Sequence, residues 1–213
     1  MTRIVKKPDE RRRELIDTAL ELFQTQGYSA TTVEAIIRKI GIAKGTFYHY
    51  FQSKEDIMAA VVQSLLDRIV EEARAVAADP SLNAIEKIKL MFGGQGSGYS
   101  EAHDVTESLH SPENRELHEK TNVETILQLS PILSEVIEQG IREGIFQVDN
   151  VLETVQFLLV GSQFLFEHVL FNWSAEEIQN RAKAMATIIE RSLGAEKGTF
   201  SFLAEMYQKE AQK

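Results

Sequence analysis

The sequence contains no cysteine, only four prolines and a single tryptophan among 213 residues. Without thiols it cannot form disulfides, a zinc–thiolate site or a cysteine nucleophile. The longest apolar stretch, residues 157–171, is interrupted by Gln163, Glu167 and His168 and is shorter than the roughly 20 residues that cross a bilayer. Residues 1–14 are charged and lack an apolar segment, so we expect no secretory signal. These absences predict a cytoplasmic protein with no membrane partner.

Alternation of apolar and polar residues, the signature of half-buried strands, is also absent, and helical spacing dominates. With 43% hydrophobic and 26% charged residues, the chain is long enough to bury a core. We therefore predict an all-α fold. The expected helices are 15–26, 33–40, 44–50, 54–77, 82–92, 150–171 and 175–193, followed by a weakly held helix within 198–213.

Several residues predict where these helices begin and end. Gly27 and Gly41 suit left-handed C-terminal caps. Thr31 and Glu34 have the spacing of a capping box at the start of the second helix. Pro131 suits the first position of a helix that begins after Ser130, and the alternative is a kink inside one longer helix.

Charge is distributed unevenly along the chain. Residues 1–54 contain ten Lys and Arg against six Asp and Glu, a net charge of +4, whereas residues 55–213 carry −13. This division predicts that only the N-terminal segment meets a polyanion. The alternative is that these charges are ordinary solvated helix faces.

Three short helices with Gly41 between the second and third predict a helix-turn-helix. Its core would comprise the apolar side chains of Ile36, Ile40, Ile42, Phe47 and Phe51. The third helix would then expose Lys44, Gly45, Thr46, Tyr48 and His49. In this geometry the third helix presents its N-terminal residues to the major groove of DNA.

The segments TTVEAII at 31–37 and GIAKGTFYHYFQSKEDI at 41–57 closely resemble the DNA-binding signature of the TetR family, and the resemblance covers about residues 10–58. It implies an N-terminal DNA-binding domain, residues 1–54, and a helical effector-binding and dimerisation domain, residues 55–213. It also implies a homodimer, most simply a repressor, that binds a palindromic DNA operator and is released by a small-molecule effector. Neither a cofactor nor a metal is implied.

The residues expected to contact DNA come from two helices and the start of a third. Lys44 can reach base-edge acceptors, and Gly45 allows the backbone to approach DNA closely. Thr46, Tyr48, His49 and Tyr50 can contact phosphates or bases. In similar proteins the residue at Lys54 binds a phosphate at a helix N-terminus, and Thr32 is placed likewise. Lys6, Lys7 and Arg11 to Arg13 form an additional candidate arm, or else a solvated run.

The C-terminal segment supplies candidates for an effector pocket. Its large aromatic side chains offer much contact area to an apolar ligand at little entropic cost. The glycine-rich residues 93–98 would let neighbouring groups move. Glu167, an acid within apolar sequence, could pair with a cationic ligand or with an Arg or His of the chain. The candidate lining residues are Phe92, Tyr99, Phe157, Phe164, Glu167 and Trp173.

Helices 150–171 and 175–193 suit a four-helix dimer interface, with intramolecular core as the alternative. The glycine run matches neither a dinucleotide-binding fingerprint nor a nucleophile elbow, and we predict no enzymatic activity. His103, His110 and His118 lack the three- or four-residue spacing of ligands on one helix, so we predict no metal site. The alternative functions are an all-α enzyme or cofactor carrier, and a DNA-binding adaptor controlled by a protein partner instead of a small molecule.

Overall fold

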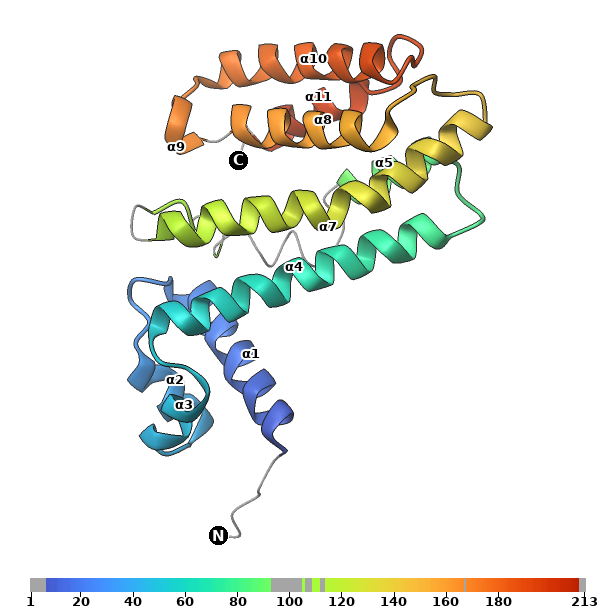
Figure 1. Ribbon diagram of the computed structural model, residues 1–213. Coiled ribbons are helices and arrows are strands. Elements are labelled where there is room, and N and C mark those ends of the chain that lie inside the picture. The colour runs from blue at the N-terminus through green and yellow to red at the C-terminus, as the bar shows by residue number, and fades with distance from the viewer. Residues whose placement is uncertain (1–6, 93–104, 106–108, 112–113, 167, 211–213) are drawn as a thin grey trace. The chain divides into compact units, whose positions relative to one another are not determined.

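The computed structural model describes residues 7–92, 105, 109–111, 114–166 and 168–210 (Figure 1). The described residues form helices and turns without a strand, which confirms the predicted all-α class. The chain divides into two compact units, and α4 (Lys54–Ala78) and α7 (Arg115–Arg142) each contribute to both. The first unit contains residues 1–69 and 97–122, and the second contains residues 70–96 and 123–213.

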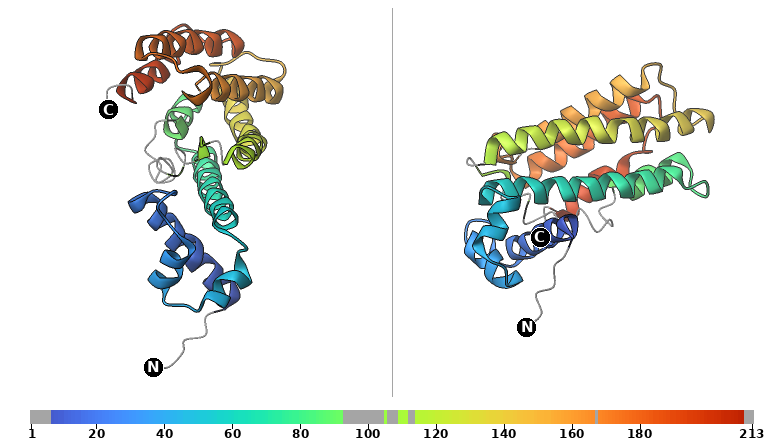
Figure 2. Two further views of the ribbon diagram at one scale, coloured as in Figure 1. Left: turned by 90° about the vertical axis from the view of Figure 1, so that its left-hand side faces the viewer. Right: turned by 60° about the horizontal axis from the view of Figure 1, so that its bottom comes forward.

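The first unit is built on three helices that cluster in every view: α1 (Pro8–Gln26), α2 (Val33–Ile40) and α3 (Lys44–Tyr50) (Figures 1 and 2). Leu15 and Phe23 of α1, Ile36 of α2 and Phe47 of α3 are fully buried in one core, together with Val61 of α4. Because each helix contributes side chains from one face only, the core fixes which face remains at the surface.

The second unit packs its helices around a separate apolar core. It contains α5 (Ala84–Phe92), most of α7, α8 (Val151–Leu165), α9 (His168–Phe171), α10 (Ala175–Ser192) and α11 (Ser201–Glu210). Helices α8 and α11 both contact α10 (Figure 1). The most buried core side chains are Ala84, Ile88, Val136, Phe146, Leu193 and Phe200.

Two boundaries within the second unit are decided by the structure. Of the two alternatives at Pro131, the structure has one longer helix, α7, which runs through the exposed Pro131. The predicted single helix 150–171 is instead two, because α8 ends at Leu165 and the short α9 begins at His168. A backbone turn at Asn172, with φ of 48°, then leads into α10, which begins at Ala175 after the N-cap residue Ser174.

The sequence suggested a weakly held C-terminal helix. In the structure, side chains at the start of this segment are instead buried in the core. Phe200 and Leu203 are 2% and 7% exposed in the core of the second unit. The buried Glu190 carboxylate accepts hydrogen bonds from the backbone N–H groups of Gly198 (2.8 Å) and Phe200 (3.1 Å). This carboxylate satisfies donors of the turn that leads into α11, and it thereby joins that turn to α10.

A buried lysine ties three helix ends of the second unit together. Lys87 of α5 is only 3% exposed. Its ammonium donates to the carbonyl of Ala77 at the end of α4 (2.6 Å) and to Oε1 of Gln139 on α7 (2.7 Å). Gln139 in turn donates to Glu143 (2.6 Å), whose other oxygen accepts from the N–H of Ala84 (3.0 Å). The hydrogen bond from Ala84 holds the pKa of Glu143 below its ordinary value.

We expect Lys87→Ala to lower the free energy of unfolding by about 2–3 kcal/mol, because it removes two charge-assisted hydrogen bonds and leaves buried acceptors without a donor. For a chain of this size the midpoint of thermal unfolding should fall by about 5–10 °C. Circular dichroism melting curves measure the shift. Lys183→Ala, at an exposed position of α10, is the matched control and should shift the midpoint by little. Equal midpoints for the two variants would contradict the bridging role of Lys87.

Candidate nucleic-acid interface

The angle between α2 and α3 is set by a turn at Gly41. Its backbone is left-handed, with φ of 75° and ψ of 38°, a conformation that glycine adopts without the steric cost of a Cβ atom. The N–H groups of Gly41 and Ile42 both donate to the carbonyl of Ile37, at 2.9 and 3.2 Å. Ile36 and Phe47, on either side of the turn, are completely buried, which confirms the predicted helix-turn-helix core.

One surface of α3 remains accessible. Lys44, Gly45, Tyr48 and His49 are exposed, while Thr46 and Tyr50 are half-buried. The structure thus brings six predicted DNA-contacting residues onto a helix of seven residues whose opposite side is anchored by Phe47. Tyr50 packs partly against the core of the first unit, which gives it a structural role as well.

Packing within the chain does not require a glycine at position 45. A Cβ atom placed on it would meet no atom of the chain within 4 Å, and its backbone is ordinary helix. Gly161 of α8 is open in the same way, so the open space shows that Gly45 lies at the surface, on the exposed side of α3.

Lys44 is not a free lysine. Its Nζ lies 3.1 Å from Oε1 of Glu34 on α2 and 5.8 Å from the centre of the Tyr48 ring. The hydrogen bond between the two side chains lowers the pKa of Glu34 and raises that of Lys44, so each favours the charged form of the other. Both side chains are well exposed, 65% for Lys44 and 58% for Glu34.

The sequence did not reveal this pair, because it assigned Glu34 to a capping box with Thr31. The N-cap of α2 is instead Thr32, whose hydroxyl accepts from the N–H of Ala35 at 3.1 Å. Thr31 is completely buried and donates to the carbonyl of Gly27 at 2.8 Å. The shift of the cap by one residue leaves the Glu34 carboxylate available to Lys44.

The ammonium of Lys54, at the start of α4, is already held by the protein. It donates to the carbonyl of Tyr28 at 3.0 Å and lies 4.2 Å from the centre of the Tyr28 ring. Tyr28 itself is buried, and its ring packs edge-on against Phe23 at 5.2 Å between centres. Lys54 therefore fastens the start of α4 to the segment after α1, whatever contact it makes with DNA.

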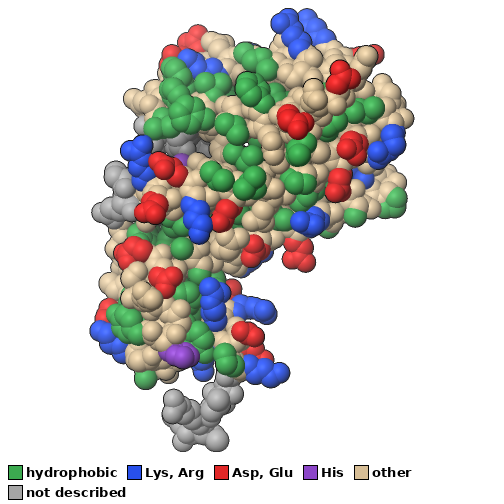
Figure 3. Space-filling view, viewed as in Figure 1, with side chains coloured by type: hydrophobic (Ala, Val, Ile, Leu, Met, Phe, Trp, Pro, Cys, Tyr) green, Lys and Arg blue, Asp and Glu red, His purple; other side chains and the backbone are tan. Residues whose placement is uncertain are grey.

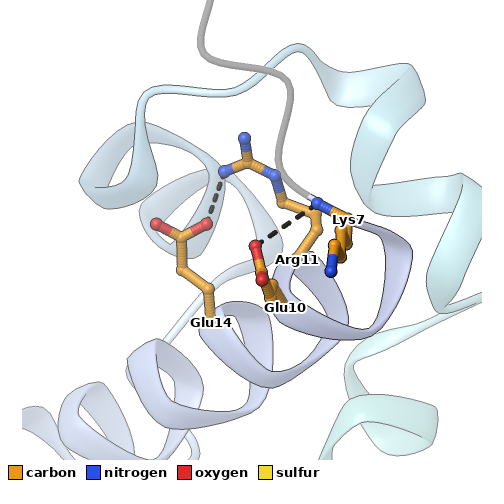
Figure 4. A network of polar contacts seen from close by, with 4 residues as sticks. All are labelled: Lys7, Glu10, Arg11 and Glu14. Atoms are coloured by element: carbon orange, nitrogen blue, oxygen red, sulfur yellow. Dashed lines mark hydrogen bonds and ion pairs between the residues drawn. The ribbon is translucent and has the colours of Figure 1, made fainter.

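Among the described basic residues at the N-terminus, Arg11, Arg12 and Arg13 lie in the first turns of α1, and Lys7 is its N-cap residue. Arg11 pairs with Glu14 at 2.5 Å, and the backbone nitrogen of Lys7 donates to Glu10 at 3.4 Å. Figure 4 shows both contacts. The guanidinium of Arg12 lies 5.3 Å from the centre of the Phe51 ring. The candidate Lys6 lies outside the described residues.

The predicted effector residues do not share one environment. Phe92 packs against the core of the second unit, but Phe157 and Phe164 lie on the surface of α8, 79% and 60% exposed. Trp173 donates to the carbonyl of Leu165 (3.1 Å), and its ring lies 3.4 Å below the Arg181 guanidinium. Tyr99 and Glu167 lie outside the described residues.

Other apolar side chains of α8 and α10 are also exposed. Leu152 and Val160 of α8 are 39% and 48% exposed, and Ile188 of α10 is 54% exposed. Figure 3 shows hydrophobic side chains exposed at this part of the second unit. Phe157, Val160 and Phe164 follow helical spacing and form one apolar strip along α8.

No group of three or more potential metal ligands occurs in the part of the chain that the structure describes. His110 and His118 have their rings in edge contact, with centres 4.8 Å apart, and His103 lies outside the described residues. Among the described helices, none combines the length and the apolar character needed to span a membrane.

Comparison with known proteins agrees with this geometry. A model of the tetR family of bacterial regulatory proteins matches residues 15–61, and a model of tetracyclin repressor-like C-terminal domains matches residues 99–188. The HTH-type transcriptional repressor KstR2 of Mycobacterium tuberculosis is 29% identical over 159 residues, which are 73% of this chain and 78% of that protein. The fatty acid metabolism regulator protein of Bacillus subtilis is 29% identical over 134 residues, 62% of this chain and 68% of that protein.

A solved structure gives the same result for the fold. A TetR/AcrR-family transcriptional regulator from Thermobifida fusca matches with a TM-score of 0.55 and 23% identity, over 92% of this chain and 97% of that one. The chain belongs to the TetR family of bacterial transcriptional regulators, with an N-terminal DNA-binding helix-turn-helix and a helical C-terminal domain. Members of this family are regulatory proteins and not enzymes.

The contacts of Lys54 lead to a prediction with two readouts. Lys54→Ala should lower the free energy of unfolding by about 1–2 kcal/mol, because it removes a charge-assisted hydrogen bond and a cation–π contact. If the ammonium also binds a phosphate, the slope of log affinity against log salt should fall by about one unit.

Thermal unfolding and DNA-binding titrations at several salt concentrations measure the two effects. Lys39→Ala removes an exposed ion pair with Glu21, 2.6 Å long, and is the control for loss of a surface lysine. If Lys54→Ala is as stable as wild type, the contacts between Lys54 and Tyr28 contribute nothing to the free energy of unfolding.

Proposed function

We propose that the protein is a ligand-responsive transcriptional repressor, which binds a near-palindromic operator as a homodimer and is released by a small apolar effector. The observation that carries this proposal is the exposed surface of α3, where Lys44, Gly45, Tyr48 and His49 lie beside open space. The name of the KstR2 relative, a transcriptional repressor, supports repression in preference to activation.

The proposed division of labour follows the chain. Residues 1–54 contact DNA, and residues 55–213 bind the effector and the second protomer. In each protomer α3 enters the major groove of one half-site, and Lys44 reaches base-edge acceptors. Thr46, Tyr48, His49 and Tyr50 contact neighbouring bases or phosphates. The hydroxyl of Thr32, at the start of α2, donates to a phosphate while it continues to cap the helix.

The reading role of α3 gives a direct test. Lys44→Ala should weaken binding to a duplex selected by the wild-type protein from a random pool by about tenfold to a hundredfold, because one bidentate base contact is worth about 1–3 kcal/mol. Fluorescence anisotropy measures this affinity, and Lys39→Ala serves as the control lysine on α2. If the Lys44 variant binds this duplex as tightly as wild type, the proposal that α3 contacts DNA bases is wrong.

The apolar strip of α8 is the proposed dimer surface, together with Ile188 of α10. We assign Phe157 and Phe164 to this surface in preference to the effector pocket, because both side chains are largely exposed in a single chain. A large apolar patch at the surface of a protomer is typical of a protein interface. If α8 and α10 of two protomers pack together about a two-fold axis, the apolar strip is buried in a four-helix interface.

We expect Phe157→Glu to shift the protein from dimer to monomer at micromolar concentration, because the interface would bury an unpaired carboxylate. Sedimentation velocity measures the change. Leu90→Glu is the matched control, since Leu90 is 46% exposed on α5, outside the strip. If both variants dimerise like wild type, the strip of α8 is not the interface.

The proposed effector has an extended apolar part. The relative in Bacillus subtilis is named as a regulator of fatty acid metabolism, and this name supports a hydrocarbon-rich ligand for the present chain. The net charge of −13 over residues 55–213 opposes ligands with several negative charges. Phe92 and Trp173 are the candidate ligand contacts among the described residues, with Tyr99 and Glu167 as candidates outside them.

A thermal-shift screen tests the effector with neutral lipids, lipophilic cations and fatty acyl thioesters as probes. A ligand at a hundred times its dissociation constant stabilises the protein by about 2.7 kcal/mol, which corresponds to a shift of about 5–10 °C. Phe92→Ala and Trp173→Phe should each reduce the shift relative to the ligand-free variant. No shift with any probe would favour control by a protein partner.

Release from DNA then follows from differential affinity. An effector that binds more tightly to a conformation with wrongly spaced reading helices shifts the dimer away from the operator by that difference in affinity. Helix α4 is the proposed lever, since the same continuous helix supplies residues 54–69 to the first unit and 70–78 to the second.

A further inference from the structure

The ion pair between Glu34 and Lys44 crosses the turn of the helix-turn-helix. Glu34 lies in the first turn of α2 and Lys44 is the first residue of α3, ten positions later in the chain. Their charged atoms are 3.1 Å apart, and more than half of each side chain is exposed. Lys44 is also the residue proposed above to read a base edge.

We infer that Glu34 is a specificity-determining residue, which retains the ammonium of Lys44 on non-operator DNA and releases it only where a base acceptor replaces the carboxylate. This inference rests on the proposed function of α3. Thr32 caps α2 through the N–H of Ala35, so this cap does not depend on the Glu34 carboxylate.

Competition is the physical basis of the effect. An exposed ion pair contributes at most about 1 kcal/mol, so a well-oriented pair of hydrogen bonds to a base edge, worth about 1–3 kcal/mol, can displace it. At a site without that acceptor, Lys44 gains little by leaving Glu34, and the protein neutralises one phosphate fewer. The pair therefore weakens non-operator binding more than operator binding.

A carboxylate beside the reading helix also repels phosphate, whatever the DNA sequence. That general repulsion would be shared by any acid of the first unit near DNA, and it would not depend on Lys44. The competition differs from it, because it disappears when Lys44 is absent. The two effects can therefore be separated by a double-mutant cycle between Glu34 and Lys44.

The experiment compares the binding of two duplexes of equal length and composition, one selected by the wild-type protein and one with the scrambled sequence. Glu34→Gln should tighten binding to the scrambled duplex by about threefold to tenfold and to the selected duplex by less, so that the specificity ratio falls. When Lys44 is already replaced by alanine, Glu34→Gln should change the affinity for the two duplexes by the same factor.

Two further variants are the controls. Glu21→Gln removes the acid of the exposed pair with Lys39, whose atoms are 2.6 Å apart, and should change the binding of both duplexes equally. Glu34→Asp retains a negative charge in the first turn of α2 but shortens the reach toward Lys44. It should lie between wild type and Glu34→Gln, and it remains informative if the glutamine variant is unstable.

The outcomes distinguish this inference from the proposed function. If Lys44→Ala binds the selected duplex as tightly as wild type, the reading role of α3 fails. If Lys44→Ala weakens binding but Glu34→Gln behaves like Glu21→Gln on both duplexes, the reading role stands and the role of Glu34 in specificity is overturned.

Discussion

The left-handed turn at Gly41 is the constraint on which the DNA-binding surface depends. It reverses the chain after α2 within a few residues, and the burial of Ile36 and Phe47 then fixes how α3 lies against α2. Once Phe47 is buried, helical spacing directs Lys44, Tyr48 and His49 outward as a group. A side chain at position 41 would strain this turn and disturb every residue that α3 presents.

Five of the ten Lys and Arg of residues 1–54 contact an acid or an aromatic ring of the protein. Lys44 pairs with Glu34, Lys39 with Glu21, and Arg11 with Glu14, while Lys54 lies on Tyr28 and Arg12 on Phe51. Binding DNA therefore exchanges internal partners for phosphates and bases. Such exchange lowers affinity for DNA in general, and it favours sites that satisfy the displaced cations best.

The second unit combines internal polar anchors with an apolar surface. Buried Lys87 and Glu190 each satisfy backbone groups at helix ends, which ties α4, α5 and α7 together and joins α11 to α10. In contrast, Phe157 and Phe164 of α8 expose ring surface to water. A rigid interior beneath an exposed apolar strip suits a surface that is completed by a second protomer.

The sequence by itself determined the all-α class, the three N-terminal helices and the residues that α3 exposes, because local spacing and the glycine at 41 encode them. It did not determine the cap at Thr32, the course of α7 through Pro131 or the anchoring of α11. The cap falls on Thr32 because packing buries Thr31, and the anchoring of α11 comes from Glu190 of α10. Lys44 meets Glu34, Lys54 meets Tyr28 and Lys87 meets Gln139 only after the helices pack, so only the tertiary structure decides which charged groups are free to meet a ligand.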